Sequence, residues 1–280
     1  MALKIVARVR WVTMRPRTTK GSFMKIATWN VNSLRVRLPQ LTTWLASNPV
    51  DVIALQETKV PDEGFPHAQV AALGYHVVAS GQKSYNGVAI LSKQPIEAVV
   101  RDMPGYTDEQ KRVLTATIGG VRIVNVYVPN GQSIESPKYQ YKLVWLQALR
   151  LFLRDELARH PQLVVLGDYN IAPEDRDVHD PAAWEGQVLV SEPERTELRA
   201  LLELGLVDVY RRFSQPENDF SWWDYRMFAF RRNRGLRIDL LLTSRALTEN
   251  CDACHIDKEP RGWERPSDHT PVVGDFRIPA

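Results

Sequence analysis

The stretch Leu163-Val164-Val165-Leu166-Gly167-Asp168-Tyr169-Asn170 joins a short run of large aliphatic residues to an abrupt polar end. The aliphatic run predicts a β-strand over residues 163–167. Asp168 and Asn170 then follow the strand on either side of Tyr169, an arrangement that suits a general base beside a hydrogen-bonding amide. An Asx turn that caps the strand would explain the same residues, so other motifs are needed to choose between the two interpretations.

Short apolar runs of this kind recur along the chain and alternate with amphipathic stretches. The predicted strands are residues 25–31, 52–56, 76–79, 87–92, 112–118, 121–128, 163–167 and 239–243. The predicted helices are residues 38–47, 138–159 and 194–204. Many strands with few helices predict a layered α/β domain.

Length and composition restrict the class of protein. A chain of 280 residues with 44% hydrophobic and 25% charged residues has the composition of an ordinary globular protein. Charged side chains interrupt its richest apolar stretch, residues 143–157, which excludes a membrane helix there. Two cysteines cannot form a disulfide framework, so we expect a cytoplasmic protein. The sequence Cys-Asp-Ala-Cys-His at 251–255 matches a haem-attachment pattern, but we interpret it as a strand because its side chains alternate.

The net charge is distributed unevenly. Residues 1–23 contain six basic and no acidic side chains, so subtracting them from the formal +3 leaves −3 for residues 24–280. An arginine-rich leader without acids resembles an organelle transit peptide. We favour a basic extension that is disordered or follows from a start codon assigned too early, and we expect residues 24–280 to form a single domain.

Polar side chains end several of the predicted strands, where a rigid scaffold commonly holds functional groups. Four apolar runs end in this way, at Asn30, Glu57, Tyr127 and Asp168. Glu57 offers the hard carboxylate oxygen that Mg²⁺ prefers, and Asn30 and Asp268 are further oxygen donors. Two Cys and six scattered His give no spacing for Zn²⁺. The sequence therefore favours a shared site that binds Mg²⁺.

Asp239 and His269 are candidates for a second functional pair. A carboxylate that is hydrogen-bonded to an imidazole fixes its tautomer and favours the cation, which can stabilise charge on a phosphate oxygen. Alternatively, His269 only caps the strand that begins at Thr270. Contact between two residues so far apart cannot be read from the sequence.

Residues 222–237 carry the strongest local signal for nucleic acid. This segment holds five arginines and one aspartate, interleaved with five aromatic residues. Arginine neutralises phosphates and aromatic rings stack on bases. A charge run more often forms a solvated face, but such a face seldom carries five aromatic residues, so we favour DNA binding. The basic side chains assigned to it are Arg226, Arg231, Arg232 and Arg234.

These motifs resemble those of the exonuclease III family of apurinic/apyrimidinic endonucleases, within the endonuclease/exonuclease/phosphatase superfamily. The matching segments, in order, are Trp29-Asn30-Val31-Asn32, Leu55-Gln56-Glu57-Thr58-Lys59, Tyr127-Val128-Pro129-Asn130, Gly167-Asp168-Tyr169-Asn170, Ser221-Trp222-Trp223-Asp224-Tyr225-Arg226, Arg234-Gly235-Leu236-Arg237-Ile238-Asp239 and Pro266-Ser267-Asp268-His269. The resemblance implies a four-layered α/β sandwich, in which two packed mixed β-sheets are flanked by helices. It also implies an enzyme that hydrolyses phosphodiesters in duplex DNA with Mg²⁺ or Mn²⁺.

The resemblance assigns roles to residues by their place in these motifs. The metal-binding group is Glu57, Asn30, Asp268, Asp168 and Asn170, with Glu57 as the main ligand. The catalytic group is Asp168, which orients or deprotonates the attacking water, with Asn170, Tyr127 and His269 on the scissile phosphate and Asp239 orienting His269. Whether Asp168 or the Asp239/His269 pair is the base, and whether one or two metals act, stays open.

Trp222 aligns with the aromatic residue that walls the pocket for a flipped-out abasic sugar. The other expected DNA contacts, besides the four arginines named above, are Asn130, Arg35 and Lys59. The expected partner is duplex DNA that is abasic or 3′-blocked, bound by a monomer. Two alternatives remain: a phosphodiesterase of the same superfamily for a small phosphorylated substrate, and a catalytically inactive DNA-binding module.

Overall fold

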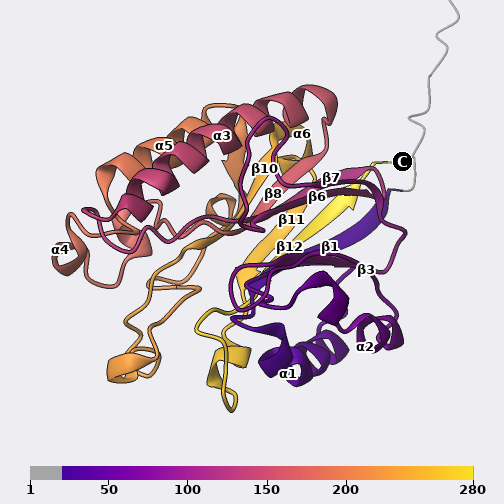
Figure 1. The fold of residues 1–280 in the computed structure, drawn as a ribbon, viewed down its shortest axis with the longest axis horizontal. Helices are drawn as coiled ribbons and strands as arrows, with labels where there is room; N and C mark the ends of the chain where they lie inside the picture. Colours follow the sequence, from indigo (N-terminus) through magenta and orange to yellow (C-terminus); the bar gives the residue numbers. More distant parts are fainter. Residues whose placement is uncertain (1–20, 280) are drawn as a thin grey trace, which may run out of the picture.

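The computed structural model describes residues 21–279, which form two six-stranded β-sheets packed face to face (Figure 1). The first sheet contains β1 (Ser22–Asn30), β2 (Val52–Gln56), β3 (His76–Ser80), β4 (Val88–Ser92), β11 (Cys251–Ile256) and β12 (Val272–Ile278), in the order β11-β12-β1-β2-β4-β3. The second contains β5 (Glu97–Arg101), β6 (Val113–Ile118), β7 (Val121–Tyr127), β8 (Leu163–Asp168), β9 (Leu206–Asp208) and β10 (Asp239–Ser244), in the order β5-β6-β7-β8-β10-β9. Both sheets are mixed, because β1 with β2 and β7 with β8 are parallel pairs among antiparallel ones.

Helices cover the outer faces of both sheets (Figure 1). Helices α1 (Leu34–Ser47) and α2 (His67–Ala72) cover the first sheet, and α3 (Pro137–Arg159) and α5 (Glu192–Leu202) cover the second. The short helices are η1 (Asp62–Gly64), η2 (Asp175–Asp177), α4 (Pro181–Trp184), η3 (Val209–Arg212), η4 (Arg226–Phe228), α6 (Arg245–Thr248) and η5 (Glu259–Gly262). This order of layers confirms the predicted four-layered α/β sandwich.

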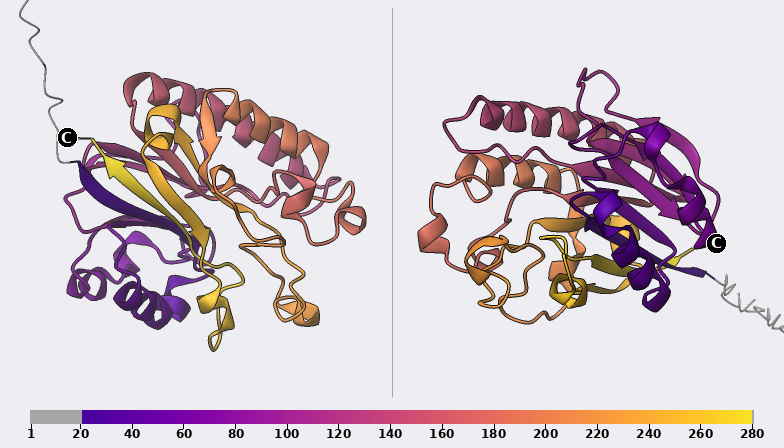
Figure 2. Two further views of the ribbon diagram at one scale, coloured as in Figure 1. Left: turned by 180° about the vertical axis from the view of Figure 1, so that it is seen from behind. Right: turned by 60° about the horizontal axis from the view of Figure 1, so that its bottom comes forward.

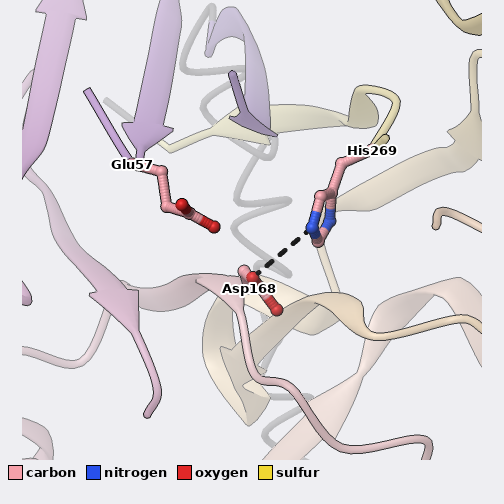
Figure 3. A group of neighbouring side chains, drawn as sticks. All are labelled: Glu57, Asp168 and His269. Carbon is pink, nitrogen blue, oxygen red and sulfur yellow. Dashed lines mark ion pairs between the residues drawn. The ribbon is translucent and has the colours of Figure 1, made fainter. Parts of the chain in front are cut away.

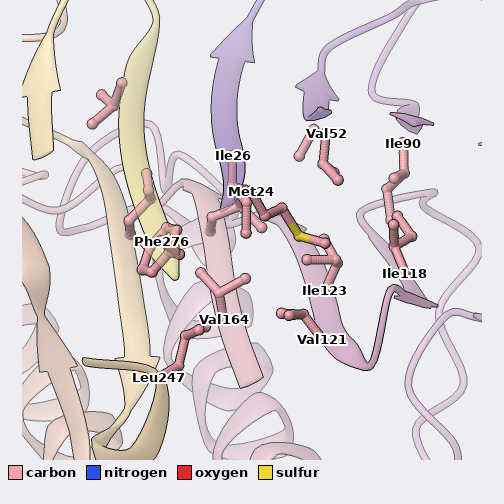
Figure 4. Close-up of a cluster of buried hydrophobic side chains, with 14 of the residues drawn as sticks. Met24, Ile26, Val52, Ile90, Ile118, Val121, Ile123, Val164, Leu247 and Phe276 are labelled. Atoms are coloured by element: carbon pink, nitrogen blue, oxygen red, sulfur yellow. The ribbon is translucent and has the colours of Figure 1, made fainter. Parts of the chain in front are cut away.

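Side chains that alternate along each strand build the apolar layers. In β1, Met24 and Ile26 join the cluster between the two sheets, which Val164 of β8 completes from the opposite side (Figure 4). On the opposite face of β1, Trp29 packs edge-on against Trp44 of α1, with ring centres 5.9 Å apart. Both faces of the central strands are covered. Their sequences are therefore mostly apolar runs, rather than an alternation of apolar and polar residues.

The predicted helices are present, and tertiary contacts decide where one of them begins. Helix α1 begins at Leu34, not at residue 38 as predicted, because the Leu34 and Ser33 N–H groups donate to Thr58 O (3.0 Å) and Glu57 O (2.8 Å). These acceptors lie just after the end of β2, far from α1 in the sequence, so the sequence around residue 34 carries no signal for the start of the helix. Strands β5 and β9 were not predicted, and both lie at sheet edges, where the apolar pattern is weakest.

The first strand also begins earlier than predicted. Strand β1 begins at Ser22, which pairs with Ile278 of β12, so the boundary predicted between residues 23 and 24 falls inside a strand. The rest of the predicted basic extension lies outside the described residues. Within residues 21–279, no helix is long and apolar enough to cross a membrane.

Two long loops project from the same side of the molecule (Figure 2). One connects β9 with β10 and carries η4, and the other connects β11 with β12 and carries η5. The first loop has a small core of its own, in which the rings of Trp223 and Phe230 lie 5.0 Å apart. These loops flank the edge of the sheets where the polar strand ends gather.

Candidate active site

The polar strand ends meet where the two sheets face each other. In the first sheet, Asn30 is in register with Gln56 at the ends of β1 and β2. In the second, Asp168 is in register with both Tyr127 and Asp239. The Asn30 Nδ2 atom bridges the sheets by donating to Asp168 Oδ2 at 2.9 Å. Strand ends from both sheets thus form one site.

Glu57, Asp168 and His269 gather at this site (Figure 3), where one ligand atom from each lies within 4.8 Å of the others. Asn30 Nδ2 also donates to Glu57 Oε1 (2.8 Å), so it joins the two carboxylates. The ammonium of Lys59 lies 2.9 Å from Glu57 Oε2 and neutralises part of the charge of that carboxylate. Carboxylate oxygens are the donors that hard divalent cations prefer, so the residues present fit a divalent metal.

Two other predicted metal ligands, Asn30 and Asp268, make hydrogen bonds to neighbouring protein groups. Asn30 turns its amide nitrogen, not its oxygen, toward the carboxylates, and its oxygen accepts from the Asn32 N–H (2.9 Å). Asp268 accepts from Asn32 Nδ2 (2.9 Å) and from Trp222 Nε1 (3.0 Å), so both of its oxygens are occupied. In this arrangement Asp268 holds Asn32 and Trp222 in place beside the site.

Several residues at the site have a left-handed backbone. The φ angles are +50° at Glu57, +54° at Lys59, +42° at Asn32 and +91° at Ser33. Residues other than glycine seldom adopt such values, and the surrounding structure has to enforce them. The Ser33 N–H donates to Glu57 O, so the segments that follow β1 and β2 hold each other in this conformation. The Glu57 side chain is therefore held at the site by a strained backbone.

Asp168 is buried at the centre of the site. Burial is the main cause that raises its pKa to about 7; Asp239 and Glu57 add to the shift, and His269 and Asn30 oppose it. The Asn170 N–H donates to Asp168 Oδ1 (2.8 Å), which fixes the orientation of the carboxylate. A carboxylate with a pKa near neutrality is suited to general-base catalysis at neutral pH.

Asp239 and His269 are brought together as predicted. His269 Nδ1 lies 2.9 Å from Asp239 Oδ2, and Nε2 lies 3.7 Å from Asp168 Oδ2. Burial alone would lower the pKa of His269, but Asp239 and Asp168 raise it to about 10. An imidazolium has no lone pair for a metal, so His269 is placed as a charged donor. Ser221, which the sequence did not indicate, donates to Asp239 Oδ2 (2.7 Å) and orients it.

The hydroxyl of Tyr127 is a neutral donor at this site. Burial, followed by the charges of Glu57 and Asp168, raises the pKa of Tyr127 well above its usual value, although Arg112 opposes the shift. The Arg112 guanidinium carbon lies 4.6 Å from the centre of the Tyr127 ring. No spacing in the sequence indicated Arg112 as a neighbour of the site.

A buried ion pair supports the loops that carry Asn130 and Asn170, whose side chains are joined by a 3.0 Å hydrogen bond. Lys142 Nζ donates to Asn170 O (2.7 Å) and Asn130 O (3.2 Å) and pairs with Glu194. Both charged side chains are fully buried. Sequence analysis missed this pair, although a lysine on the apolar face of the predicted helix 138–159 was a signal that could have found it.

The predicted DNA contacts are distributed around the site. The exposed ones are Arg226, Arg231, Arg232 and Arg234 on the loop between β9 and β10, Arg35 on α1, and Asn130. Trp222 is half-buried and packs edge-on against Trp184, with ring centres 6.5 Å apart. Lys59, in contrast, lies within the carboxylate group rather than on the surface around it.

Two residues counted in the basic and aromatic segment are structural. Arg237 is buried and pairs with Asp177 (2.6 Å) and Asp208 (2.7 Å), so its charge is neutralised inside the protein. Trp223 is fully buried in the core of its loop. The exposed basic and aromatic surface of the segment is therefore smaller than its composition suggested.

Known proteins share the fold and nearly the whole length of this chain. The model of the Endonuclease/Exonuclease/phosphatase family matches residues 27–269. Exodeoxyribonuclease III of Haemophilus influenzae is 37% identical over 267 residues, which cover 91% of this chain and 100% of that protein. The structure of the 3′ phosphatase NExo from Neisseria, bound to a product DNA hairpin, is 47% identical with a TM-score of 0.89 and covers 90% of this chain and 99% of its own. An AP endonuclease from Archaeoglobus fulgidus is 42% identical with a TM-score of 0.88, over 91% of this chain and 100% of its own.

Proposed function

This chain belongs to the endonuclease/exonuclease/phosphatase family, and from that premise we propose that it is a DNA repair nuclease that uses Mg²⁺, with Mn²⁺ as a substitute. The observation that carries the proposal is the joining of Glu57 and Asp168, from opposite sheets, by the Asn30 amide beside His269. Attack on a phosphate ester needs a cation, a positioned water and donors to the phosphate oxygens. Side chains of this site would hold the cation, position the water and donate hydrogen bonds to the phosphate oxygens.

Glu57 is the residue proposed to hold the metal, and the Asn30 amide fixes its carboxylate. When bound, the cation neutralises charge on the phosphate and on the leaving oxygen. Lys59, which contacts Glu57 at 2.9 Å, has to be displaced from that oxygen or share the carboxylate with the ion. Rigid, strained backbone at Glu57 keeps the ligand in place before the substrate arrives.

Asp168 is proposed to orient the attacking water and accept its proton. With its pKa raised to about 7 by burial, the carboxylate is still ionised in a large fraction at neutral pH and is basic enough to take a proton. Asn30 and Asn170 hold the two carboxylate oxygens from different sides. Asp239, whose Oδ2 lies 2.9 Å from His269 Nδ1, is proposed to orient His269, and Asp168 is proposed as the base in preference to the Asp239/His269 pair.

Donors to the phosphate oxygens are the proposed role of His269, Tyr127 and Asn170. His269 brings a positive charge that Asp239 and Asp168 stabilise, and Tyr127 brings a neutral hydroxyl. Fixed donors in a buried site stabilise developing negative charge more strongly than water does.

The substrate that we propose is duplex DNA with an abasic site or a blocked 3′ end, bound by a monomer. Support comes from the relatives: the Neisseria structures are described as a 3′ phosphatase and a 3′-5′ exonuclease, and the Archaeoglobus fulgidus protein as an AP endonuclease. Trp222, held by Asp268 at the edge of the site, is proposed as the wall of the sugar pocket. The predicted cytoplasmic location stays a prediction.

The test is cleavage of three labelled duplexes, with an abasic site, a 3′-phosphate or a normal 3′ end, in Mg²⁺, in Mn²⁺ and in EDTA. We expect metal-dependent cleavage of at least one duplex, and Asp168→Asn to slow it by roughly 10²–10⁴-fold while DNA binding is kept. Absence of all three activities in metal would refute the nuclease proposal and favour an inactive DNA-binding module. Hydrolysis of a small phosphodiester with no action on DNA would favour the other alternative.

A further inference from the structure

An aromatic pocket of about 340 Å³ lies between the two projecting loops. Its walls include four aromatic and two basic side chains, namely Tyr225, Phe228, Phe230, Trp263, Arg231 and Arg261. The first loop, with η4, and the second, with η5, each supply part of the wall. None of the three clustered residues of the candidate active site lines this pocket, so it is a separate feature.

Arg261 is a largely buried cation in the wall of this pocket. Its side chain is only 7% exposed, and its guanidinium carbon lies 5.3 Å from the Tyr225 ring centre and 5.1 Å from that of Phe230. One nitrogen donates to Trp223 O (3.1 Å), but Nε is buried without a hydrogen-bond partner among the described residues. The guanidinium therefore supplies a positive charge beside two aromatic rings of the pocket.

The loop segment that forms the outer wall of the pocket has a strained backbone. Phe228 is 67% exposed, and both Phe228 and Met227 have a left-handed backbone, with φ of +55° and +58°. The Arg231 guanidinium lies 5.8 Å from the centre of the Phe228 ring. A large ring that a strained loop holds in solvent beside an arginine is a stacking surface with charge next to it.

Tyr225 connects the pocket with the candidate active site. Its ring lines the pocket, and its hydroxyl donates to Pro266 O (2.9 Å) and lies 3.4 Å from Asn32 Nδ2. The same Asn32 nitrogen donates to Asp268, which holds Trp222 beside the site. The pocket is therefore a neighbour of the active site, with one tyrosine ring between them.

We propose that this pocket binds one unpaired nucleobase of the DNA, next to the nucleotide that reacts. Aromatic rings stack on any base, and the Arg261 guanidinium beside Tyr225 and Phe230 supplies a positive charge that suits the acceptor-rich edge of a base. A volume near the lower end of the roughly 300–1,000 Å³ range of ligand pockets suits a single base, whereas a base pair would have to separate to enter. The exposed Arg231, which lines the pocket, supplies positive charge for the phosphates of the same strand.

This proposal rests on the proposed DNA substrate and extends it to duplexes with an unpaired or frayed nucleotide near the reacting phosphate. It predicts that the protein binds a duplex with a short single-stranded overhang, of 3′ or 5′ polarity, more tightly than the matching blunt duplex. A 2-aminopurine placed in the preferred overhang should lose fluorescence on binding, because it stacks on the aromatic wall.

Binding is measured by fluorescence anisotropy in EDTA, so that cleavage does not interfere. Phe228→Ala should weaken binding of the preferred overhang duplex about tenfold, restore the 2-aminopurine signal and leave blunt-duplex affinity unchanged. Phe228→Leu, which keeps apolar volume without a ring, should behave like Phe228→Ala. The matched control is Met227→Ala, since Met227 is exposed in the same loop but does not line the pocket.

Each other outcome overturns the proposal. Equal weakening of blunt and overhang duplexes by Phe228→Ala and Met227→Ala would mean that the loop inserts into paired DNA instead. Unchanged binding in Phe228→Ala, or a Phe228→Leu variant that behaves like the wild type, would exclude stacking on this ring. Failure of the proposed function is distinguished separately, because the wild type would then cleave none of the three test duplexes in Mg²⁺.

Discussion

Glu57 combines a strained backbone with a carboxylate that already attracts a cation. We expect Glu57→Gln to lower turnover by at least about 100-fold, because the weaker ligand removes several kcal/mol of transition-state stabilisation. DNA affinity should change much less, since the arginines proposed to contact phosphate lie elsewhere. Turnover and DNA affinity are measured on the same variant over a range of Mg²⁺ concentrations. Near-normal turnover at ordinary Mg²⁺ would show that the ligand is assigned wrongly.

His269 is charged because of its two carboxylate neighbours. Burial opposes the charged form, but Asp239 and Asp168 raise the pKa of His269 to about 10 in the metal-free protein. A histidine whose pKa rises on folding stabilises the protein fully below its unfolded value near 6.5, and this stabilisation is lost as the pH rises through about 10. Stability between these values therefore depends on the imidazolium.

Asp239→Asn should bring the pKa of His269 down, because the amide removes the strongest raising charge. We expect the imidazole signals in NMR spectra of the metal-free variant to titrate at lower pH than in the wild type, and turnover at neutral pH to fall. Ser221→Ala is the comparison that keeps the charge of Asp239, because it removes a hydrogen bond to that carboxylate and the acceptor of the Ile238 and Asp239 N–H groups. An unchanged His269 titration in Asp239→Asn would mean that Asp168 alone sets the charge.

In the loop between β9 and β10, buried structural residues and exposed residues lie only a few positions apart in the sequence. Trp223 and Arg237 hold the loop from inside, and the arginines between them face solvent. The buried pair of Lys142 on α3 and Glu194 on α5 also holds loops from inside the protein. It fixes the loops of Asn130 and Asn170 through hydrogen bonds from the Lys142 ammonium. A buried pair seldom adds net stability, so its value here is the position of the active-site amides.

Arg232→Ala tests the surface part of this loop. Since Arg232 is exposed and lies outside the aromatic pocket, we expect weaker binding to every duplex alike and a salt dependence whose slope is smaller by about 1. The measurement is the dissociation constant for blunt, abasic and overhang duplexes at several salt concentrations. A loss confined to one duplex would instead indicate that Arg232 recognises a feature of that DNA.

Deleting residues 2–20 should leave the fold intact. Strand β1 begins at Ser22 and is paired along its length by β12 and β2, so the sheet is complete without the leader. We expect an unchanged melting temperature and near-normal cleavage at moderate salt. At low salt, DNA binding should weaken, because the leader carries six basic side chains and no acid. A melting temperature lower by several degrees would show that the leader stabilises the domain.

The amino-acid sequence alone determined the class of fold and most of the chemistry. Short apolar runs are set by local burial, so the strands that end in Asn30, Glu57 and Asp168 could be read from it. Carboxylates and amides at those ends indicated a cation and a phosphate before any geometry was known. The three long helices were equally readable, apart from the start of α1, whereas the short helices α2, α4 and α6 were not predicted.

Only the tertiary structure decided which of these groups act together. Asp239 meets His269, and Asp268 turns to Trp222 and Asn32, because of how the two sheets and their loops are packed. Lys142 and Arg237 look like surface charges in the sequence but are buried, since their partners come from distant elements. Hydrophobic periodicity is a local property, whereas the order of the strands and the meeting of their ends depend on contacts summed over the whole chain.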